Sequence, residues 1–250
     1  MSFKDHFSGH AAAYAAARPT YPDALFDWLA TLAPRSATVL DCGCGNGQAS
    51  LALAERFARV VATDASREQL ANAARHARVE YRVASAEASG LPDASVALVT
   101  AAQAVHWFDH ARFAAECRRV LVPGGVVAVW CYALNSVTPA VDAVTRRLYE
   151  DLTGPYWSPE RRYIDERLAT LHFPFATLAA PGFAMVSRWT LAQFLAYLGT
   201  WSATQKYQRA RHEDPVAVLE AEFAAAWGDA TQAREVRFPL CLRVGAVLDS

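Results

Sequence analysis

Residues 38–47, TVLDCGCGNG, decide the fold that we expect for this chain. The stretch opens with apolar residues, as buried strands do, and closes with three alternating glycines. Glycine adopts backbone angles that other residues avoid, and it lets a ligand approach the backbone closely. In an open parallel sheet, ligands bind beyond the carboxyl ends of the strands, commonly at the first strand-to-helix turn. The stretch therefore predicts a strand that leads into a ligand-binding turn.

Strand-like runs and helical stretches alternate after this turn, which indicates an α/β fold with a parallel sheet covered by helices. We expect helices over 48–57, 66–77 and 110–121, and strands over 59–64, 79–85, 96–104 and 126–132. Ser66 is the expected N-cap of the second helix, with Gln69 completing a capping box. Beyond residue 132 we expect a helical cap, then a strand at 183–189, helices at 191–201 and 216–228, and a closing strand at 236–247.

Composition indicates one globular unit with several parts. The 250 residues are 53% hydrophobic and 20% charged, which suffices for a sizeable core without disulfides or metals. We expect an N-terminal helical segment over the cofactor site (1–36), a cofactor-binding core (37–132), a helical cap insertion (133–180) and a C-terminal part completing the sheet (181–250).

Charge, hydropathy and cysteine usage favour a cytoplasmic protein with a small-molecule substrate. A formal charge of −1 leaves no extended basic field for nucleic acid. The apolar runs are far shorter than the ~20 residues that cross a bilayer, so we expect no membrane association. The five cysteines are odd in number and scattered, which predicts reduced thiols and no metal site. A monomer or homodimer is expected.

Two acidic residues stand where a cofactor would be held. Asp64 ends the second strand, from which a carboxylate can accept hydrogen bonds from both ribose hydroxyls; the alternative is an ordinary capping acid before Ser66. Asp41 is expected to orient the turn and to meet an ammonium group directly or through water, unless it is merely a strand-end acid. The binding residues expected here are Asp41, Gly43, Gly45, Gly47, Asp64, Ala65 and Gln69.

The glycine spacing separates two classes of cofactor. Nicotinamide proteins use Gly-x-Gly-x-x-Gly, in which the helix N-terminus faces a pyrophosphate. Here the third glycine, Gly47, comes one residue earlier and Asp41 precedes the first. A sulfonium cofactor that carries an amino acid has no phosphate, and it suits this turn better. A nicotinamide dehydrogenase remains a rival interpretation.

With residues 41–47, Asp64, Ser85-Ala-Glu87 and 121–125 in this order, the stretch 37–132 resembles class I S-adenosylmethionine-dependent methyltransferases. The opening FSGHAAAYAAARPTYP, the run His106-Trp-Phe-Asp109 and TWSATQKY are similar to the small-molecule group that includes trans-aconitate methyltransferase-like enzymes. The resemblance implies a Rossmann-like, seven-stranded, mostly parallel sheet with helices on both faces, an inserted helical cap and an antiparallel last strand. It also implies that S-adenosylmethionine is the cofactor.

The same resemblance implies further cofactor contacts. Ser85, Ala86 and Glu87 would surround the adenine; many relatives carry Asp at the first position, so backbone groups or Glu87 would meet its amino group here. Gln103 and Ala104 would line the methionine side. The N-terminal Tyr14 and Arg18 would fold over the cofactor, with the arginine near its carboxylate, or the arginine is a surface residue.

Methyl transfer is an in-line displacement in which the protein mainly aligns the two reactants. His106 follows the fourth strand and is a candidate general base, or it only lines the pocket. Arg161 and Arg162 could bind a carboxylate acceptor, giving ester formation, or be solvated helix charges. The expected substrate residues are His106, Trp107, Tyr132, Tyr156, Trp157, Arg161, Arg162 and Trp201.

Two further functions stay open from the residues alone. A nucleic-acid methyltransferase is disfavoured, since the fourth strand is followed by no Asn/Asp-Pro-Pro-Tyr or Pro-Cys motif. A cofactor-binding regulatory protein without catalysis would keep the same glycine turn. Neither the acceptor nor the oligomeric state follows from the pattern.

Overall fold

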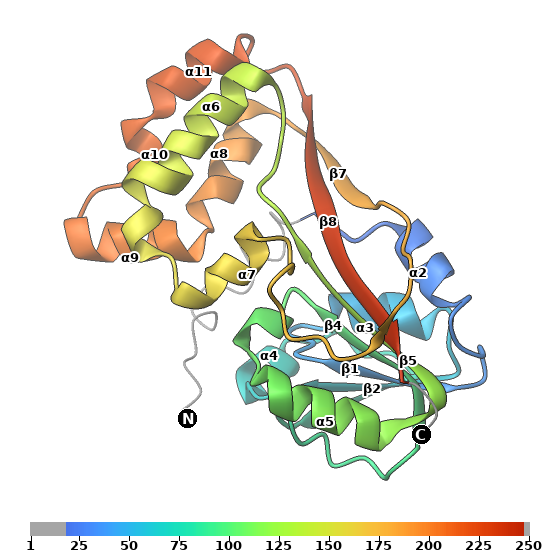
Figure 1. Cartoon of the computed structure of the whole chain (residues 1–250). Coiled ribbons are helices and arrows are strands. Elements are labelled where there is room, and N and C mark those ends of the chain that lie inside the picture. Colours follow the sequence, from blue (N-terminus) through green and yellow to red (C-terminus); the bar gives the residue numbers. More distant parts are fainter. Residues whose placement is uncertain (1–18, 248–250) are drawn as a thin grey trace.

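The computed structural model describes residues 19–247, so Tyr14 and Arg18 lie outside the described residues. A sheet flanked by helices forms one part of the molecule and a cluster of helices forms the other (Figure 1). Long strands run from the first part to the second, and the helical part is called the helical lobe below. This α/β arrangement confirms the fold class predicted from the alternating pattern.

The sheet has the strand order β3-β2-β1-β4-β5-β8-β6, and β7 pairs with β8 beyond this path. Strands β1 to β5 pair in parallel, and β8 is antiparallel to β5. Parallel pairing brings the carboxyl ends of β1 to β4 to one edge. The strands are β1 (Thr38–Cys42), β2 (Arg59–Asp64), β3 (Val79–Val83), β4 (Val96–Ala102), β5 (Leu121–Tyr132), β6 (Ala176–Thr177), β7 (Ala184–Trp189) and β8 (Arg234–Ala246).

The sheet has eight strands, one more than the seven that the resemblance implied. Strand β7 pairs with the first half of β8, as expected, from Ala184 opposite Pro239 to Trp189 opposite Arg234. The other end of β8 pairs with the two-residue β6. Strand β8 is long enough to serve both neighbours, because its 13 residues extend from the sheet to the helical lobe (Figure 1).

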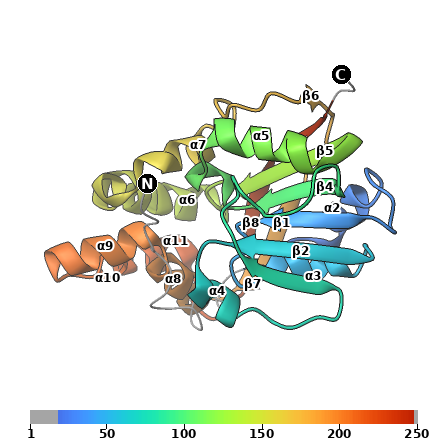
Figure 2. The same ribbon diagram turned by 90° about the horizontal axis from the view of Figure 1, so that it is seen from below.

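Side chains alternate between two hydrophobic cores on the two faces of the sheet, as the period of a strand requires. Val39 joins the core under α2 (Asp23–Leu29) and α3 (Gln48–Ala54), whereas Leu40 joins the core under α5 (His110–Val120). Figure 2 shows α3 and α5 on opposite faces of the strands. The first core continues into the helical lobe through buried residues such as Phe194 and Trp227. This first core therefore connects the sheet part of the molecule with the helical lobe.

One helix is shorter than expected. The second helix of the sheet part, α4 (Arg67–Ala71), spans five residues, although the sequence predicts a helix to residue 77. Ser66 does cap it, because its side chain accepts a hydrogen bond from the Gln69 N–H. No residue of α4 is buried, and isolated helices depend on a packed apolar face for their stability. The missing tertiary support explains the early end.

The helical lobe is built from two separate stretches of the chain. Helix α6 (Pro139–Arg147), which follows β5, packs against α11 (Glu220–Trp227), which precedes β8. Residues after 180 therefore contribute to the lobe as well as to the sheet. The helices are α6 (Pro139–Arg147), the π-helical Leu148–Leu152, the 3-10 turns Gly154–Tyr156 and Pro159–Arg161, α7 (Arg162–Asp165), α8 (Leu191–Gly199), α9 (Ser202–Arg211), α10 (Pro215–Val218) and α11 (Glu220–Trp227).

Two kinds of feature were not found within residues 19–247. None of the helices there has the length and apolarity needed to cross a membrane. No group of three or more His, Cys, Asp or Glu side chains in the same range is arranged to hold a metal ion.

Candidate active site

The glycine turn lies between β1 and α3, at the carboxyl edge of the sheet. Gly43 and Gly45 both have positive φ values, of 64° and 55°. A Cβ on Gly43 would stand 2.6 Å from the Cβ of Ala104, so this position has no room for a side chain. Among the described residues, the atom nearest to a Cβ on Gly45 would be Gln69 Oε1, at 3.9 Å. The turn is therefore packed at Gly43 and open at Gly45, while Gly47 serves as the N-cap of α3.

Asp64 connects the glycine turn to the loop after β2. Its Oδ2 accepts a hydrogen bond from Gly45 N at 2.8 Å, and its Oδ1 accepts one from Ser66 N at 2.8 Å. The side chain thus acts at the start of α4, as the simpler interpretation expected, and it also reaches the turn. Both bonds fix the position of the carboxylate next to the open space at Gly45.

Asp41 is completely buried at the end of β1. Its two oxygens accept hydrogen bonds from Ser50 Oγ at 2.6 Å and from Thr100 Oγ1 at 2.7 Å. Burial raises the pKa of this carboxyl from 3.8 to about 6, although the two hydroxyls partly offset the effect. Asp41 thereby ties β1 to α3 and β4, which orients the turn, and near neutral pH it places a negative charge beneath it.

Gln103 and Ala104 follow β4 and connect the glycine turn with a cavity beyond it. Ala104, together with the Phe108 ring, closes the space beside Gly43. Gln103 lines the cavity and has a φ of 54°, which is uncommon for a residue with a side chain. Its backbone N donates to Trp130 O at 2.8 Å, and its Oε1 accepts from Tyr132 N at 2.9 Å. These bonds to β5 hold the turn after β4 in place. Ala104 therefore meets the glycine turn, while the preceding residue, Gln103, lines the cavity.

The remaining expected cofactor residues lie along the same edge, after β2 and β3. Ala65 is exposed and Gln69 faces Gly45 from α4. Of the three residues after β3, Ser85 is exposed and Ala86 is buried. Glu87 Oε1 accepts a hydrogen bond from Asp109 N at 2.9 Å, which ties this loop to the start of α5.

The cavity beyond Gln103 has a volume of about 80 Å³ and lies between the sheet edge and the helical lobe. Side chains from β5, α7, α8 and the start of α9 close around it, together with the 3-10 turn after β4. Among the described residues, six of the thirteen that line it carry aromatic rings and one, Arg161, is cationic. The lining residues are Gln103, His106, Trp107, Tyr132, Ala133, Leu134, Trp157, Ser158, Arg161, Ile164, Tyr197, Trp201 and Ser202.

Arg161 is the cationic residue of this cavity, and neighbouring side chains hold it firmly. Its guanidinium lies 4.6 Å from the centre of the Trp157 ring, and its Nε donates to Tyr149 Oη at 2.7 Å. Asp165 Oδ1 is 3.5 Å from the same nitrogen. Arg162 points elsewhere: it stacks on Tyr163 at 4.8 Å and does not line the cavity. Of the two arginines expected to meet an acceptor, the structure brings one to the site.

Comparisons with known proteins identify the family. The family described as "Methyltransferase domain" matches residues 40–129. A Dictyostelium discoideum protein named as a methyltransferase is 30% identical over 246 residues, which cover 95% of this chain and 93% of that protein. A solved structure of a type II methyltransferase, so named, from Anaeromyxobacter dehalogenans is 49% identical with a TM-score of 0.87, covering 93% of this chain and 99% of that one.

The chain belongs to the S-adenosylmethionine-dependent methyltransferases. A third relative of this methyltransferase is a trans-aconitate 2-methyltransferase from Azoarcus sp., 38% identical over 126 residues. That match covers 48% of this chain and 47% of that protein. These findings confirm the resemblance read from the glycine turn and from the residues that follow it.

His106 of the methyltransferase is buried in the cavity wall. Its Nδ1 has no hydrogen-bond partner among the described residues, and its ring lies 4.9 Å from that of Trp107. Burial lowers the pKa of the imidazole from 6.5 to about 3, with the nearby Arg161 and His110 adding to the effect. The ring is therefore neutral near pH 7. A general base works best when its pKa lies near the operating pH, so His106 is a poor proton acceptor.

The structure separates the expected substrate residues into two groups. His106, Trp107, Tyr132, Trp157, Arg161 and Trp201 line the cavity. Tyr156 does not; its ring packs against Tyr207 at 5.3 Å. Among the lining residues, Tyr197 of α8 was not expected, and neither were Ile164 and Ser202. No sequence motif marks these three residues, because packing of the helical lobe brings them to the cavity. Only the aromatic side chain of Tyr197 could have suggested a place in the cavity wall.

Proposed function

We propose that this methyltransferase binds S-adenosylmethionine along the carboxyl edge of β1 to β4 and methylates a small carboxylate in the adjoining cavity. One observation carries the proposal: Ala104 packs on Gly43 of the glycine turn, while its neighbour Gln103 lines the cavity. A methyl donor in the turn and an acceptor in the cavity would then meet across two consecutive residues. Such close placement is the main requirement of an in-line transfer.

The glycine turn and Asp64 fit the adenosine part of the cofactor. Among residues 19–247, no side chain comes nearer than 3.9 Å to a Cβ built on Gly45, so a ligand can approach the backbone there. A carboxylate accepts about four hydrogen bonds, so its bonds from Gly45 N and Ser66 N are compatible with two ribose hydroxyls as well. Ser85, Ala86 and Glu87 would bound the adenine, and Ala65 and Gln69 would flank the ribose.

The methionine part of the cofactor fits the neighbourhood of Asp41 and Gln103. Asp41 is buried between two strands and carries a charge near neutral pH, which favours a nearby ammonium group. Gln103 and Ala104 would form the wall on this side. Tyr14 and Arg18 remain expectations from the family resemblance. When bound, S-adenosylmethionine supplies an activated methyl group together with its own leaving group.

Arg161 supports a carboxylate as the acceptor. Its Nε is engaged by Tyr149 and Asp165, which fixes the plane of the guanidinium at the cavity wall. A fixed guanidinium pairs with a carboxylate in a two-pronged geometry that lysine cannot offer. The Azoarcus relative is named for a carboxylate, trans-aconitate, which agrees with this choice. The positive charge of Arg161 would hold the acceptor carboxylate while one carboxylate oxygen faces the methyl group.

The state of His106 agrees with such an acceptor. A carboxylate is already ionised near pH 7, so it would need no general base to accept the methyl group that the bound cofactor would supply. The neutral His106 would instead offer its buried Nδ1 as a hydrogen-bonding group to the acceptor. The aromatic rings of Trp157, Trp201 and Tyr132 would exclude water from the reacting atoms.

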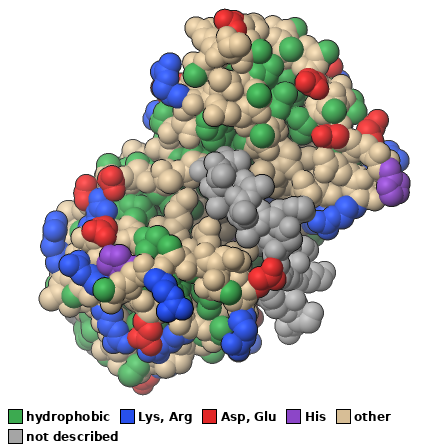
Figure 3. All heavy atoms as spheres, turned by 180° about the vertical axis from the view of Figure 1, so that it is seen from behind, with side chains coloured by type: hydrophobic (Ala, Val, Ile, Leu, Met, Phe, Trp, Pro, Cys, Tyr) green, Lys and Arg blue, Asp and Glu red, His purple; other side chains and the backbone are tan. Residues whose placement is uncertain are grey.

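The surface favours a small acceptor over nucleic acid. On the face shown in Figure 3, Lys and Arg side chains are interspersed with Asp and Glu over the sheet part. A protein that grips a phosphate backbone presents a more uniformly basic surface. We further propose a cytoplasmic protein that acts as a monomer or homodimer.

Labelled methyl transfer tests the proposal. The protein is incubated with methyl-labelled S-adenosylmethionine and separate panels of carboxylic acids, amines and phenols. A methyl ester releases labelled methanol in alkali, whereas N-methyl and aryl O-methyl products do not. We expect the label in alkali-labile products of the carboxylic acids. Label that appears only in alkali-stable products would reject the carboxylate acceptor, and no label with any panel would reject a small carboxylate as the substrate.

A pair of variants tests the role of the arginine. Arg161→Gln should lower kcat/KM for the acceptor by about 10- to 100-fold, because a hydrogen bond to a charged group contributes ~1.5–3 kcal/mol. Arg162→Gln serves as the matched control, since that side chain lies outside the cavity, and it should behave as wild type. Affinity for S-adenosylhomocysteine should stay unchanged in both. Equal effects of the two substitutions would contradict the assignment.

A further inference from the structure

Cys131 and Cys241 lie directly opposite each other on the antiparallel strands β5 and β8. Flanking backbone bonds show the kind of pairing: Ala133 N donates to Pro239 O, and Val247 N donates to Gly125 O. The hydrogen-bonded pairs therefore fall on the odd-numbered residues of β5, which include Cys131. Opposed residues of this kind have Cα atoms ~5.5 Å apart, inside the 4.4–6.8 Å range of disulfides.

The two thiols interact with each other across the strands. Both side chains belong to the core under α5, with Cys131 fully buried and Cys241 at its partly exposed edge. The two side chains are near enough for each to shift the pKa of the other thiol. Neither cysteine has a part in the proposed methyl transfer, so this contact has no explanation in that reaction.

The surroundings make the two sulfurs chemically unequal. The Cys131 thiol and the positive charge of Arg167 lower the pKa of the Cys241 thiol. The Cys241 thiol and burial raise the pKa of Cys131. Because the thiolate is the reactive form, the more exposed cysteine is also the better nucleophile of the pair.

We propose that Cys131 and Cys241 form a reversible, peroxide-sensitive disulfide site. The Cys241 thiolate attacks one peroxide oxygen, so that a sulfur–oxygen bond forms, the oxygen–oxygen bond breaks and hydroxide leaves. The Cys131 sulfur then attacks the resulting sulfenic acid, which forms the disulfide and releases hydroxide that the Cys131 proton converts to water. Two thiols are oxidised and one peroxide is reduced to two waters.

The other three cysteines lack this combination. Cys42 and Cys117 are buried, and burial raises the pKa of both thiols. Cys44 is partly exposed, yet burial and the charges of Asp41 and Asp64 raise its pKa. All three are therefore held as unreactive thiols, and oxidation should be confined to the cross-strand pair.

The disulfide would be easily reduced and would affect the cavity. Directly opposed Cβ atoms on paired strands stand ~4.5–5.5 Å apart, whereas a disulfide needs ~3.8 Å, so the strands must shift toward each other. Strain of this kind makes a disulfide more reducible. Tyr132 follows Cys131 in the chain, and Ile164 shares its core; both line the acceptor cavity.

Peroxide treatment followed by peptide mapping tests this site. Reduced protein is exposed to hydrogen peroxide, free thiols are alkylated, and peptides are mapped without reduction. We expect two of the five thiols to disappear, a linked peptide that contains Cys131 and Cys241, and full recovery with dithiothreitol. A disulfide between other cysteines, or loss of thiols without a linked peptide, would overturn the proposal.

Three variants separate the two steps of the reaction. Cys241→Ser should slow the loss of thiols by about tenfold or more, since the reactive thiolate is gone. Cys131→Ser should stop the reaction at a sulfenic acid on Cys241, which dimedone traps. Cys117→Ala is the control and should form the disulfide at the wild-type rate. Circular dichroism of each reduced variant checks that it is folded, and a Cys131→Ser protein that is folded but yields no dimedone adduct would refute the mechanism.

Discussion

Replacing the buried carboxylate by an amide, Asp41→Asn, should stabilise the cofactor-free protein at neutral pH. The pKa of Asp41 is raised from 3.8 to about 6 by burial. The native protein therefore holds this proton more tightly than the unfolded chain does. The favourable contribution is complete below about pH 4 and is lost as the pH rises through about 6. Above that pH, the native state carries the cost of a buried charge.

The magnitude follows from the size of the pKa shift. About two pKa units, at 1.36 kcal/mol each, correspond to ~3 kcal/mol of free energy of unfolding. The amide can keep both hydrogen bonds: its oxygen can accept from Ser50, and its NH₂ can donate to Thr100 Oγ1. The threonine hydroxyl can then turn to Leu40 O, which lies 3.5 Å away. One of the two amide N–H groups is left without a partner, so ~3 kcal/mol is the upper limit of the gain.

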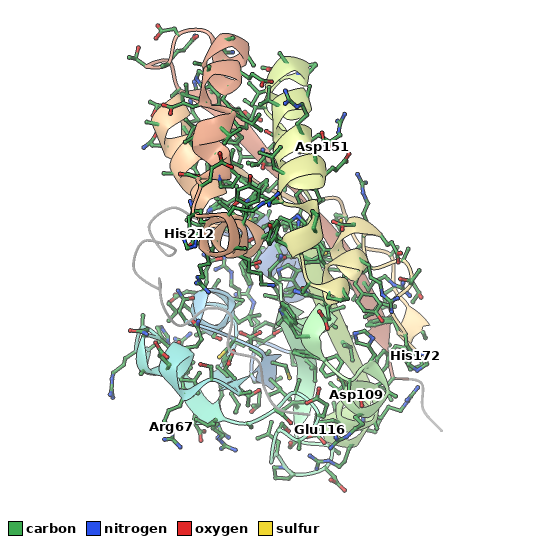
Figure 4. All side chains as sticks on the ribbon, turned by 90° about the vertical axis from the view of Figure 1, so that its left-hand side faces the viewer. Arg67, Asp109, Glu116, Asp151, His172 and His212 are labelled. Carbon is green, nitrogen blue, oxygen red and sulfur yellow. The ribbon has the colours of Figure 1, made fainter. Side chains whose placement is uncertain are left out.

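Thermal and urea unfolding between pH 4 and pH 7.5 measure this effect. Relative to wild type, the variant should gain up to ~3 kcal/mol between pH 4 and pH 7, or up to roughly 6–12 °C in Tm for a chain of this size. Asp151→Asn is the matched control, because that carboxylate projects from the surface of the helical lobe (Figure 4). The same variant should bind S-adenosylhomocysteine more weakly, since the charge facing the ammonium is removed.

Two results would refute this reasoning. A stability difference that is constant with pH would show that ionisation of Asp41 plays no part. A variant that is less stable than wild type at pH 7 would show that the carboxylate gains more from its two hydroxyl partners than it loses by burial.

Three further substitutions or titrations probe the site. Gly45→Leu should abolish S-adenosylhomocysteine binding in calorimetry, at a stability cost of ~1–2 kcal/mol. Gly124→Leu is the control, because Gly124 also has a positive φ and open space around it, and this variant should bind normally. Binding retained in Gly45→Leu would exclude the proposed pocket. Gln103→Leu removes the acceptor of the Tyr132 N–H and should cost ~1–3 kcal/mol and lower kcat, with Gln103→Glu close to wild type by melting and kinetics. The His106 ring should show no NMR titration above pH 5, because its pKa is about 3. The free energy of unfolding should fall as the pH drops from 6.5 toward 3. An NMR titration of this ring near pH 6.5 would contradict its burial.

Local sequence pattern predicted the part of the fold that forms the cofactor edge. The strand, glycine turn and Asp64 lie where the alternation of elements placed them, since neighbouring parallel strands end at one edge. The pattern was less informative for α4, whose predicted length ignored the lack of a buried face. It also missed β6, because two paired residues leave no periodic signal.

The amino-acid sequence alone determined the α/β fold, the turn at Gly43 and Gly45 and the family, because a few neighbouring residues specify each of these features. Only the tertiary structure decided that Arg161 and not Arg162 faces the cavity, that Tyr197 joins them, and that Cys131 meets Cys241. The physical reason is the range of the interactions. Backbone preference acts over a few residues, whereas the direction of a side chain in the lobe and the register of β5 with β8 depend on packing between segments that are distant in the chain.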